Sequence, residues 1–231
     1  MNDKMFEAAT LILPLIFAIV FHEVAHGLVA KWLGDPTASE RGRLTLNPFK
    51  HVDPIGTVVV PGLLALSHMP VFGWAKPVPV LPTRMRNPRL GMMLSAAAGP
   101  GMNLIMALVA AVTIGLMVRL DGDQEPVGAG LFVFKNLANF LQINLFLALF
   151  NLLPIPPFDG SHIVEGLLPE RLADAYGSLR RYGMMLALVL LVALPQLIPG
   201  FDVVSPLIRP PYQWFLDLYG SVVVAVSGVS V

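Results

Sequence analysis

The chain contains no cysteine among its 231 residues. A disulfide framework, a thiolate metal site and a cysteine nucleophile are therefore all excluded. Any metal ion has to be held by histidine, aspartate or glutamate side chains. This leaves 5 histidines and 15 acidic residues as candidate metal ligands.

Charge is also scarce. Charged residues make up only 13% of the chain, whereas soluble domains carry roughly 25%. A chain with so little charge cannot cover a globular surface, which argues against a soluble cytosolic enzyme. Lysine plus arginine equals aspartate plus glutamate, at 15 each, and no long basic block is present, so we expect no nucleic-acid partner. The 55% content of hydrophobic residues also excludes intrinsic disorder.

The sequence has long apolar runs instead. Four of them reach the ~20 residues that a helix needs to cross ~30 Å of hydrocarbon. These runs cover residues 8–30, 92–118, 136–158 and 182–201. Residues 54–75 and 212–231 are weaker candidates. We predict an all-α multi-pass membrane protein with about five to six transmembrane helices.

A small membrane-embedded β element is predicted between Trp74 and Pro82. Prolines at 77, 79 and 82 forbid a helix there, and an extended backbone fits them. The proline edge of such a strand lacks N–H donors, whereas Val78 and Val80 offer a donor and an acceptor on the other edge. The alternating segment 41–46 is a candidate pairing partner. We therefore expect an edge strand with one side competent for pairing.

The charges between the runs indicate how the chain is oriented. Basic residues gather in the connections 31–50, 84–89 and 171–181, whereas the connection 119–125 is mainly acidic. Basic loops stay on the cytoplasmic side. We therefore expect a multi-pass protein of the cell (inner) membrane whose first span runs from outside to inside. Residues 54–82 then have to enter the membrane and return.

The residues with the clearest chemistry are His22-Glu23-Val24-Ala25-His26 in the first run. Histidines at positions i and i+4 lie ~40° apart on one helical face, so both imidazoles can reach one Zn²⁺ ion. Glu23 stands beside them, where it can take a proton from a metal-bound water. A charge inside hydrocarbon costs ~2.5 kcal/mol or more, and a bound cation offsets that cost. A polar helix–helix contact or a proton-relay cluster is the alternative interpretation.

Catalytic zinc needs a third protein ligand and an open position for water. Asp159 is the candidate, because it directly follows the proline-rich end of the third run. The prolines break the helix, and irregular backbone at membrane depth is tolerated only where it lines a cavity or is buried in protein. A carboxylate there that faces His22 and His26 completes a His₂Asp site. The alternative is an ordinary interfacial turn.

Together these motifs resemble the site-2 protease family of intramembrane zinc metallopeptidases, from the first run to about Leu168. The segments that carry the resemblance are HEVAHG (22–27), LNP (46–48), HVDPIG (51–56), GWAKPV (73–78), AGP (98–100) with Asn103, and NLLPIPPFDG (151–160). The resemblance implies one Zn²⁺ ion per chain, with His22, His26 and Asp159 as ligands. It implies Glu23 as general base and Asn151 as a residue that helps to hold the substrate or the developing oxyanion. The chain is similar to a minimal form of the family, without PDZ or CBS domains.

The resemblance also implies the reaction, which is hydrolysis of peptide bonds within or near transmembrane segments of membrane proteins in the lipid bilayer. The expected substrate is a transmembrane protein of the anti-sigma-factor or signal-peptide type. Its unwound segment is expected to pair with the one-sided strand, at an active site that opens toward the cytoplasmic side. The candidate substrate-binding residues are Asn103, Trp74, Lys76 and Val78. A divalent-metal transporter or channel that uses the same cluster is the alternative function, although no internal repeat is visible.

A single integral-membrane peptidase domain is expected over residues 1–231, with a catalytic core at about 8–168 and C-terminal helices at about 182–231. Within the core, the small residues Ala96, Ala97, Ala98, Gly99 and Gly101 are expected to allow close helix packing. Asn103 fits either a structural hydrogen bond or a contact in the cavity. An inactive relative with a structural zinc ion is a third possibility, which the complete His₂Asp set argues against.

Overall fold

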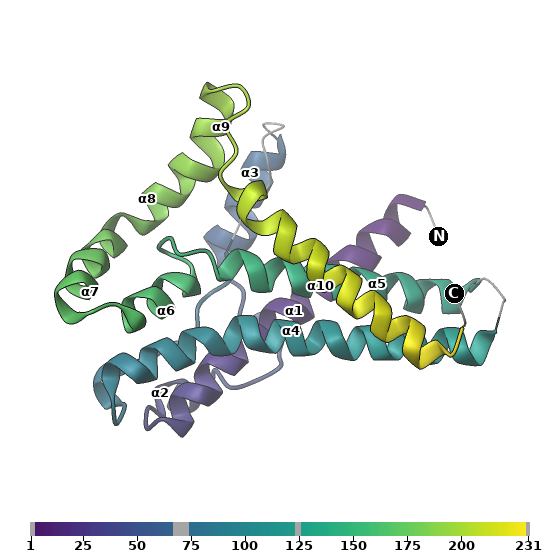
Figure 1. Ribbon diagram of the computed structural model, residues 1–231, viewed down its shortest axis with the longest axis horizontal. Helices are drawn as coiled ribbons and strands as arrows, with labels where there is room; N and C mark the ends of the chain where they lie inside the picture. The colour runs from purple at the N-terminus through teal and green to yellow at the C-terminus, as the bar shows by residue number, and fades with distance from the viewer. Residues whose placement is uncertain (1–2, 67–73, 123–125, 230–231) are drawn as a thin grey trace. The chain divides into compact units, whose positions relative to one another are not determined.

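The computed structural model describes residues 3–66, 74–122 and 126–229. Within these ranges every regular element is helical, and no β-strand is assigned. The longest helices are α1 (Asp3–Trp32), α4 (Pro88–Asp121), α5 (Ala129–Asn151) and α10 (Val204–Ser227), shown in Figure 1. The all-α prediction is confirmed for the described residues.

Four helical segments of the described chain are long and apolar enough to cross a membrane. They are Met5–Trp32, Pro88–Leu120, Ala129–Asn151 and Glu170–Leu197. Each overlaps one of the four long apolar runs, so these runs are confirmed as helices of membrane-crossing length. The last segment is built from α7 (Glu170–Gly177), α8 (Gly183–Leu188) and α9 (Leu194–Leu197) with 3₁₀ and π turns between them.

Helix α5 ends where the sequence stops supporting a helix. Pro154, Pro156 and Pro157 follow its last residue, Asn151, and a proline inside a helix removes a backbone hydrogen bond and clashes with the preceding turn. The chain turns and resumes a helix at Asp159, the first residue of α6 (Asp159–Leu167). The predicted break of the helix before Asp159 is therefore confirmed.

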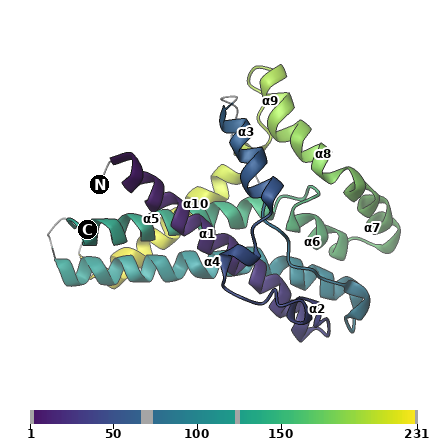
Figure 2. The same cartoon turned by 180° about the vertical axis from the view of Figure 1, so that it is seen from behind.

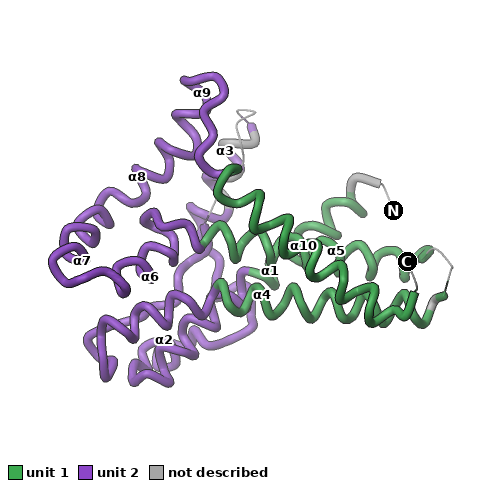
Figure 3. The backbone as a smooth tube through the Cα atoms, viewed as in Figure 1, with its two compact units in different colours: residues 1–18, 100–151, 205–231 green, residues 19–99, 152–204 purple. Residues whose placement is uncertain are grey.

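The chain divides into two compact units (Figure 3). The first contains Met1–Ala18, Pro100–Asn151 and Ser205–Val231. The second contains Ile19–Gly99 and Leu152–Val204. The HExxH motif and Asp159 all belong to the second unit.

Three alanines, three larger aliphatic residues and one tyrosine form the buried core of the first unit. The buried side chains come from three helices: Ala107, Ala110, Ala111 and Ile114 of α4, Leu141 and Leu145 of α5, and Tyr219 of α10. Helices α4 and α5 run alongside each other and α10 crosses them obliquely (Figures 1 and 2). The alanines let the helix backbones approach closely, and the Tyr219 hydroxyl donates to the carbonyl oxygen of Leu104 at 3.1 Å.

The second unit contains the shorter elements, among them α2 (Thr37–Glu40) and α3 (Val60–Leu66). Asp53 accepts the backbone N–H groups of Ile55 and Gly56 at 3.0 and 2.7 Å. This cap starts a helical turn that continues into α3. The weak run at 54–75 is thus helical up to Leu66, and its continuation over 67–73 lies outside the described residues.

Residues 74–81 form no helix, as their prolines predict, and also no strand. The N–H of Trp74 donates to the carbonyl oxygen of Gly56 at 3.0 Å, and the N–H of Lys76 to that of His51 at 2.9 Å. The expected backbone pairing with 41–46 is not seen. Arg43 of that segment instead donates from its side chain to the carbonyl oxygen of Lys76. The β element therefore stays a prediction.

Candidate functional site

Three ligand-type side chains converge in the second unit. His22 and His26 lie about one turn apart on α1, with ring centroids 4.6 Å apart and planes at 86°. Asp159 places its Oδ2 atom 3.1 Å from His22 Nε2 and 3.3 Å from His26 Nε2. All three ligand atoms lie within 4.8 Å of one another. The structure thus brings together the three residues that the sequence indicates as metal ligands.

The spacing of these atoms fits zinc. Ligands at ~2.0–2.1 Å in a tetrahedral arrangement lie about 3.3 Å from one another, close to both Nε2–Oδ2 distances. Two imidazoles and one carboxylate form a donor set typical of catalytic zinc, which keeps a fourth position for water. The side chains of His22 and His26 are only 9% and 12% exposed, so the site is shielded from bulk solvent.

Helix α4 orients His26. The Nδ1 atom of His26 lies 2.7 Å from the carbonyl oxygen of Ser95, and the Ser95 hydroxyl donates to the His26 carbonyl oxygen at 3.0 Å. When Nδ1–H donates to Ser95, the lone pair of Nε2 stays free for a metal ion. The sequence gives little sign of this role, because Ser95 is one hydroxyl in a run of small residues.

Gly99, about one turn after Ser95 on α4, faces both imidazoles. A Cβ atom built there would lie 2.4 Å from His26 Nε2 and 2.6 Å from His22 Cε1. Only glycine leaves space for the two rings at this position. Among the small residues 96–99 and 101 that were expected to allow close packing, Gly99 is the one that lies against both imidazoles, so α4 closes one side of the site there.

Glu23, the candidate general base, contacts the extended segment. Its Oε2 atom accepts the backbone N–H of Val78 at 2.7 Å. Val78 is buried and packs on Gly27, where a Cβ would come within 2.8 Å of the valine Cγ1. The glutamate of the HExxH motif and the valine edge of the proline-rich segment are therefore in direct contact.

Asn103 and Asn151 belong to the first unit. Asn103 is fully buried, and its amide donates to Asn144 Oδ1 at 2.7 Å and to the carbonyl oxygen of Ala18 at 3.2 Å. An amide that joins three helices in this way favours the structural interpretation of Asn103. Asn151 donates through Nδ2 to the carbonyl oxygen of Leu147 at 2.9 Å, and its catalytic role stays a prediction.

Trp74 and Lys76 lie at the other end of the extended segment. Trp74 is partly buried against Gly56, where a Cβ would come 2.3 Å from the indole Nε1 atom. Its carbonyl oxygen accepts the Thr57 hydroxyl at 3.0 Å. Lys76 is exposed, and its carbonyl oxygen accepts Arg43 Nη2 at 2.7 Å. Both residues are held close to Val78 in the chain, and their contact with substrate stays a prediction.

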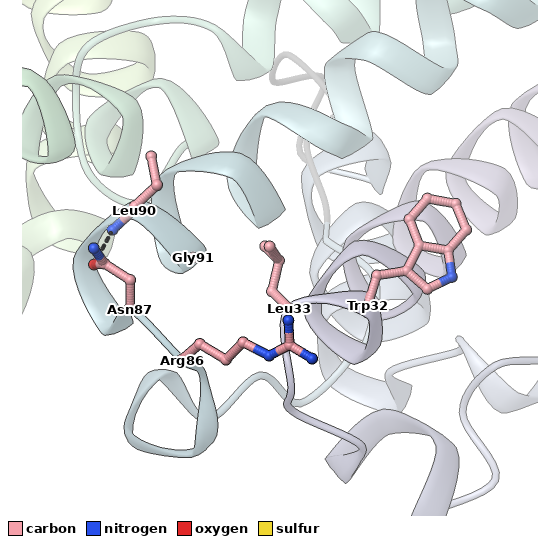
Figure 4. Close-up of a pocket in the computed structure, with 6 residues that line it drawn as sticks. All are labelled: Trp32, Leu33, Arg86, Asn87, Leu90 and Gly91. Atoms are coloured by element: carbon pink, nitrogen blue, oxygen red, sulfur yellow. Dashed lines mark hydrogen bonds between the residues drawn. The ribbon is translucent and has the colours of Figure 1, made fainter.

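A surface pocket of about 200 Å³ lies where α1 ends and α4 begins (Figure 4). Its lining consists of Trp32, Leu33, Arg86, Asn87, Leu90 and Gly91. None of the candidate ligands lines this pocket, so it is separate from the metal centre.

The site and its setting define a class of protein. Two histidines and a glutamate lie in a helix of membrane-crossing length, and an aspartate that follows the third such helix completes a His₂Asp set. This donor set with an adjacent glutamate is that of a hydrolytic zinc centre. The fold and the site are those of an integral-membrane zinc metallopeptidase.

Comparison with known proteins agrees with this class. The model of peptidase family M50 matches residues 127–194. The chain is 41% identical over 183 residues to "Putative zinc metalloprotease YwhC" of Bacillus subtilis (strain 168). This alignment covers 79% of this chain and 80% of that protein. It is 29% identical over 178 residues to "Putative zinc metalloprotease Rip2" of Mycolicibacterium smegmatis, covering 77% of this chain and 64% of that protein. No solved structure matches the chain significantly.

The chain belongs to peptidase family M50, the site-2 protease family. It is an intramembrane zinc metalloprotease whose cofactor is Zn²⁺ and whose substrates are membrane proteins in the lipid bilayer. The transporter alternative gains no support, since both relatives carry metalloprotease names.

Proposed function

We propose that His22, His26 and Asp159 hold the zinc ion and that Glu23 is the general base for peptide-bond hydrolysis. The observation that supports this is the convergence of the three ligand atoms within 4.8 Å of one another, with Glu23 next to His22 on α1. Bound zinc supplies Lewis-acid activation of water and of the scissile carbonyl group. The chain's own side chains carry the remaining steps.

Glu23 moves the proton in this proposal. Its Oε2 atom is engaged by the Val78 N–H, and we assign proton transfer to the other oxygen, Oε1. Glu23 takes a proton from the attacking water and passes it to the nitrogen of the leaving amine. The Val78 contact keeps the carboxylate in one orientation through both transfers.

Asn151 is proposed to donate to the oxyanion or to hold the substrate, as the family resemblance implies. A preorganised amide donor of this kind has large effects on rate. Its amide donates to the carbonyl oxygen of Leu147, so the side chain has to turn away from its own helix to act. We propose that the whole chain, residues 1–231, forms one peptidase domain.

A helical substrate hides its peptide bonds and has to unwind before it reacts. We propose that the unwound segment pairs with residues 74–81 by strand addition, which forms the predicted β element in the complex. The N–H of Val80 has no hydrogen-bond partner among the described residues, so it is the donor open on the valine edge. Trp74, Lys76 and Val78 are proposed to contact the substrate from this segment, whereas the hydrogen bonds of buried Asn103 to Ala18 and Asn144 give it a structural role.

We propose that α10 is a fifth membrane helix and that residues 54–82 enter and leave on one side as a sixth segment. With 24 residues, α10 is long enough to cross ~30 Å of hydrocarbon at ~1.5 Å per residue. The basic connections then face the cytoplasm from the inner membrane. The active site opens on that side and accepts transmembrane substrates of the anti-sigma-factor or signal-peptide type.

The test compares the wild-type protein with Glu23→Gln in detergent on a membrane-span substrate. Loss of the general base should lower the cleavage rate by about 10²- to 10⁴-fold. Bound zinc should stay at the wild-type level, because Glu23 is not a proposed ligand. The control Glu40→Gln removes a carboxylate from an exposed ion pair with Arg84 and should change neither value. Equal cleavage by Glu23→Gln and wild type would refute the proposal.

A further inference from the structure

Charged side chains hold the backbone of residues 76–81 in place of a sheet. Pro77 and Pro79 remove N–H groups that a β ladder would need. Three hydrogen bonds to charged side chains replace the ladder: Arg43 Nη2 to the Lys76 carbonyl oxygen at 2.7 Å, the Val78 N–H to Glu23 Oε2 at 2.7 Å, and the Leu81 N–H to Asp35 Oδ2 at 2.5 Å. The segment is therefore anchored at both ends and touches the candidate base between the anchors.

Asp35 is the fully buried anchor. Its Oδ1 atom accepts both the N–H and the hydroxyl of Thr37, while Oδ2 accepts Leu81. Burial opposes ionisation, but the hydrogen bonds from Thr37 and Leu81 outweigh it and hold the pKa of the Asp35 carboxyl below its usual range. Hydrogen bonds to an ionised carboxylate are among the strong ones in proteins, so Asp35 is a firm attachment point for Leu81.

We propose that Asp35 is a positioning residue for Glu23, acting through the backbone between Leu81 and Val78. Arg43 anchors the same segment from its other end. Pro79 fixes its own φ angle and restricts the residue before it, Val78. A shift at Leu81 is therefore passed on to the Val78 N–H, and the Glu23 carboxylate loses its fixed orientation. The inference rests on the proposed role of Glu23 as general base.

Asp35→Asn is the variant that tests this path. An asparagine keeps one oxygen for Thr37 but turns an NH₂ group toward the Leu81 N–H, so the Leu81 contact is lost selectively. We expect kcat to fall on the order of 10- to 100-fold because the base is misplaced. KM should rise by a smaller factor, because the same segment carries the Val80 donor proposed for the substrate. Zinc content should equal that of the wild type.

A second measurement does not depend on catalysis. Val78 lies between Pro77 and Pro79, which have no N–H, so residue-resolved hydrogen exchange follows the Val78 amide without an adjacent amide. In Asp35→Asn the Val78 amide should exchange at least about tenfold faster than in the wild type, whereas amides of α1 around His22 keep their protection. Arg43→Gln, which removes the contact with the Lys76 carbonyl oxygen at the other end of the segment, should also lower kcat and speed up exchange of the Val78 amide.

A lowered kcat together with faster Val78 exchange supports the inference. Unchanged kcat, unchanged Val78 exchange, or a rise in KM alone would overturn it. If Asp35→Asn does not fold, Arg43→Gln decides by the same two measurements. The positioning role of Asp35 can fail while the proposed role of Glu23 stands. An inactive Glu23→Gln variant together with a fully active Asp35→Asn variant would refute only the positioning role.

Discussion

The Nδ1 atom of His26 lies 2.7 Å from the carbonyl oxygen of Ser95. This contact joins a candidate metal ligand on α1 to the backbone of α4. About one turn further along α4, Gly99 has no Cβ atom, and the two imidazoles occupy the space that a Cβ would take. One helix thus supplies the histidines, and another supplies the orientation and the room that they need.

Gly99→Ala should displace His26. The added Cβ would lie 2.4 Å from His26 Nε2, so the ring has to move. We expect the zinc affinity to fall about 10- to 100-fold, as when the support of a metal ligand is lost. The helix itself should remain stable, because alanine is favoured over glycine in a helix by up to ~1 kcal/mol. Zinc titration against a competing chelator measures the change.

Gly101→Ala is the matched control on the same helix. No described atom lies within 4 Å of a Cβ built at Gly101, so the zinc affinity should stay at the wild-type value. An equal loss of zinc affinity in both variants would contradict the steric role of Gly99, since it would indicate a general effect on α4.

Val80→Pro should weaken substrate binding and leave the contacts of the candidate base, Glu23, unchanged. Proline suits an extended backbone but has no N–H, so the donor proposed for the substrate is lost while the Glu23–Val78 contact remains. One lost hydrogen bond is worth about 0.5–1.5 kcal/mol, which corresponds to a rise in KM of about 2- to 13-fold. Val80→Ala keeps the N–H and should keep the wild-type KM. Equal KM values for the wild type, Val80→Pro and Val80→Ala would show that strand addition through the Val80 N–H is wrong.

Asn103→Ala should destabilise the protein and leave its chemistry intact. The substitution removes the donor that bonds Asn144 Oδ1 and the Ala18 carbonyl oxygen. Hydrogen bonds between membrane helices average ~0.6 kcal/mol and reach ~1.7 kcal/mol, so the free energy of unfolding should fall by that order. Denaturation in mixed micelles measures it. A higher KM with unchanged stability would instead indicate that Asn103 contacts the substrate.

The membrane helices and the break before Asp159 were predictable because both depend on local composition. Long apolar runs predict the spans, and the three prolines after Asn151 end α5. The i, i+4 spacing alone places His22 and His26 on one face of α1. The prediction that Asp159 faces these histidines rested on the chemistry of zinc, because no local sequence pattern indicates it.

The contacts made by Ser95, Gly99 and Asp35 were not predictable, because they depend on which residues meet when distant segments pack. The pairing of 41–46 with the proline-rich segment was expected from the alternation of polar and apolar residues in 41–46. Such alternation does not show whether the proline-rich backbone is held by another strand or, as here, by side chains. Helix α10 likewise begins at Val204 rather than near 212. Its first two turns contain Arg209 and three prolines, Pro206, Pro210 and Pro211, so no continuous apolar run marks the start of this helix.

The most direct test of the metal site is the zinc content of purified Glu23→Gln protein with and without a second substitution, Asp159→Ala. The inactive background prevents self-cleavage from altering the result. We predict about one zinc ion per chain in Glu23→Gln and less than about a tenth of that in the double variant, because a bare histidine pair cannot complete the site. A full equivalent of zinc in the double variant would contradict the account.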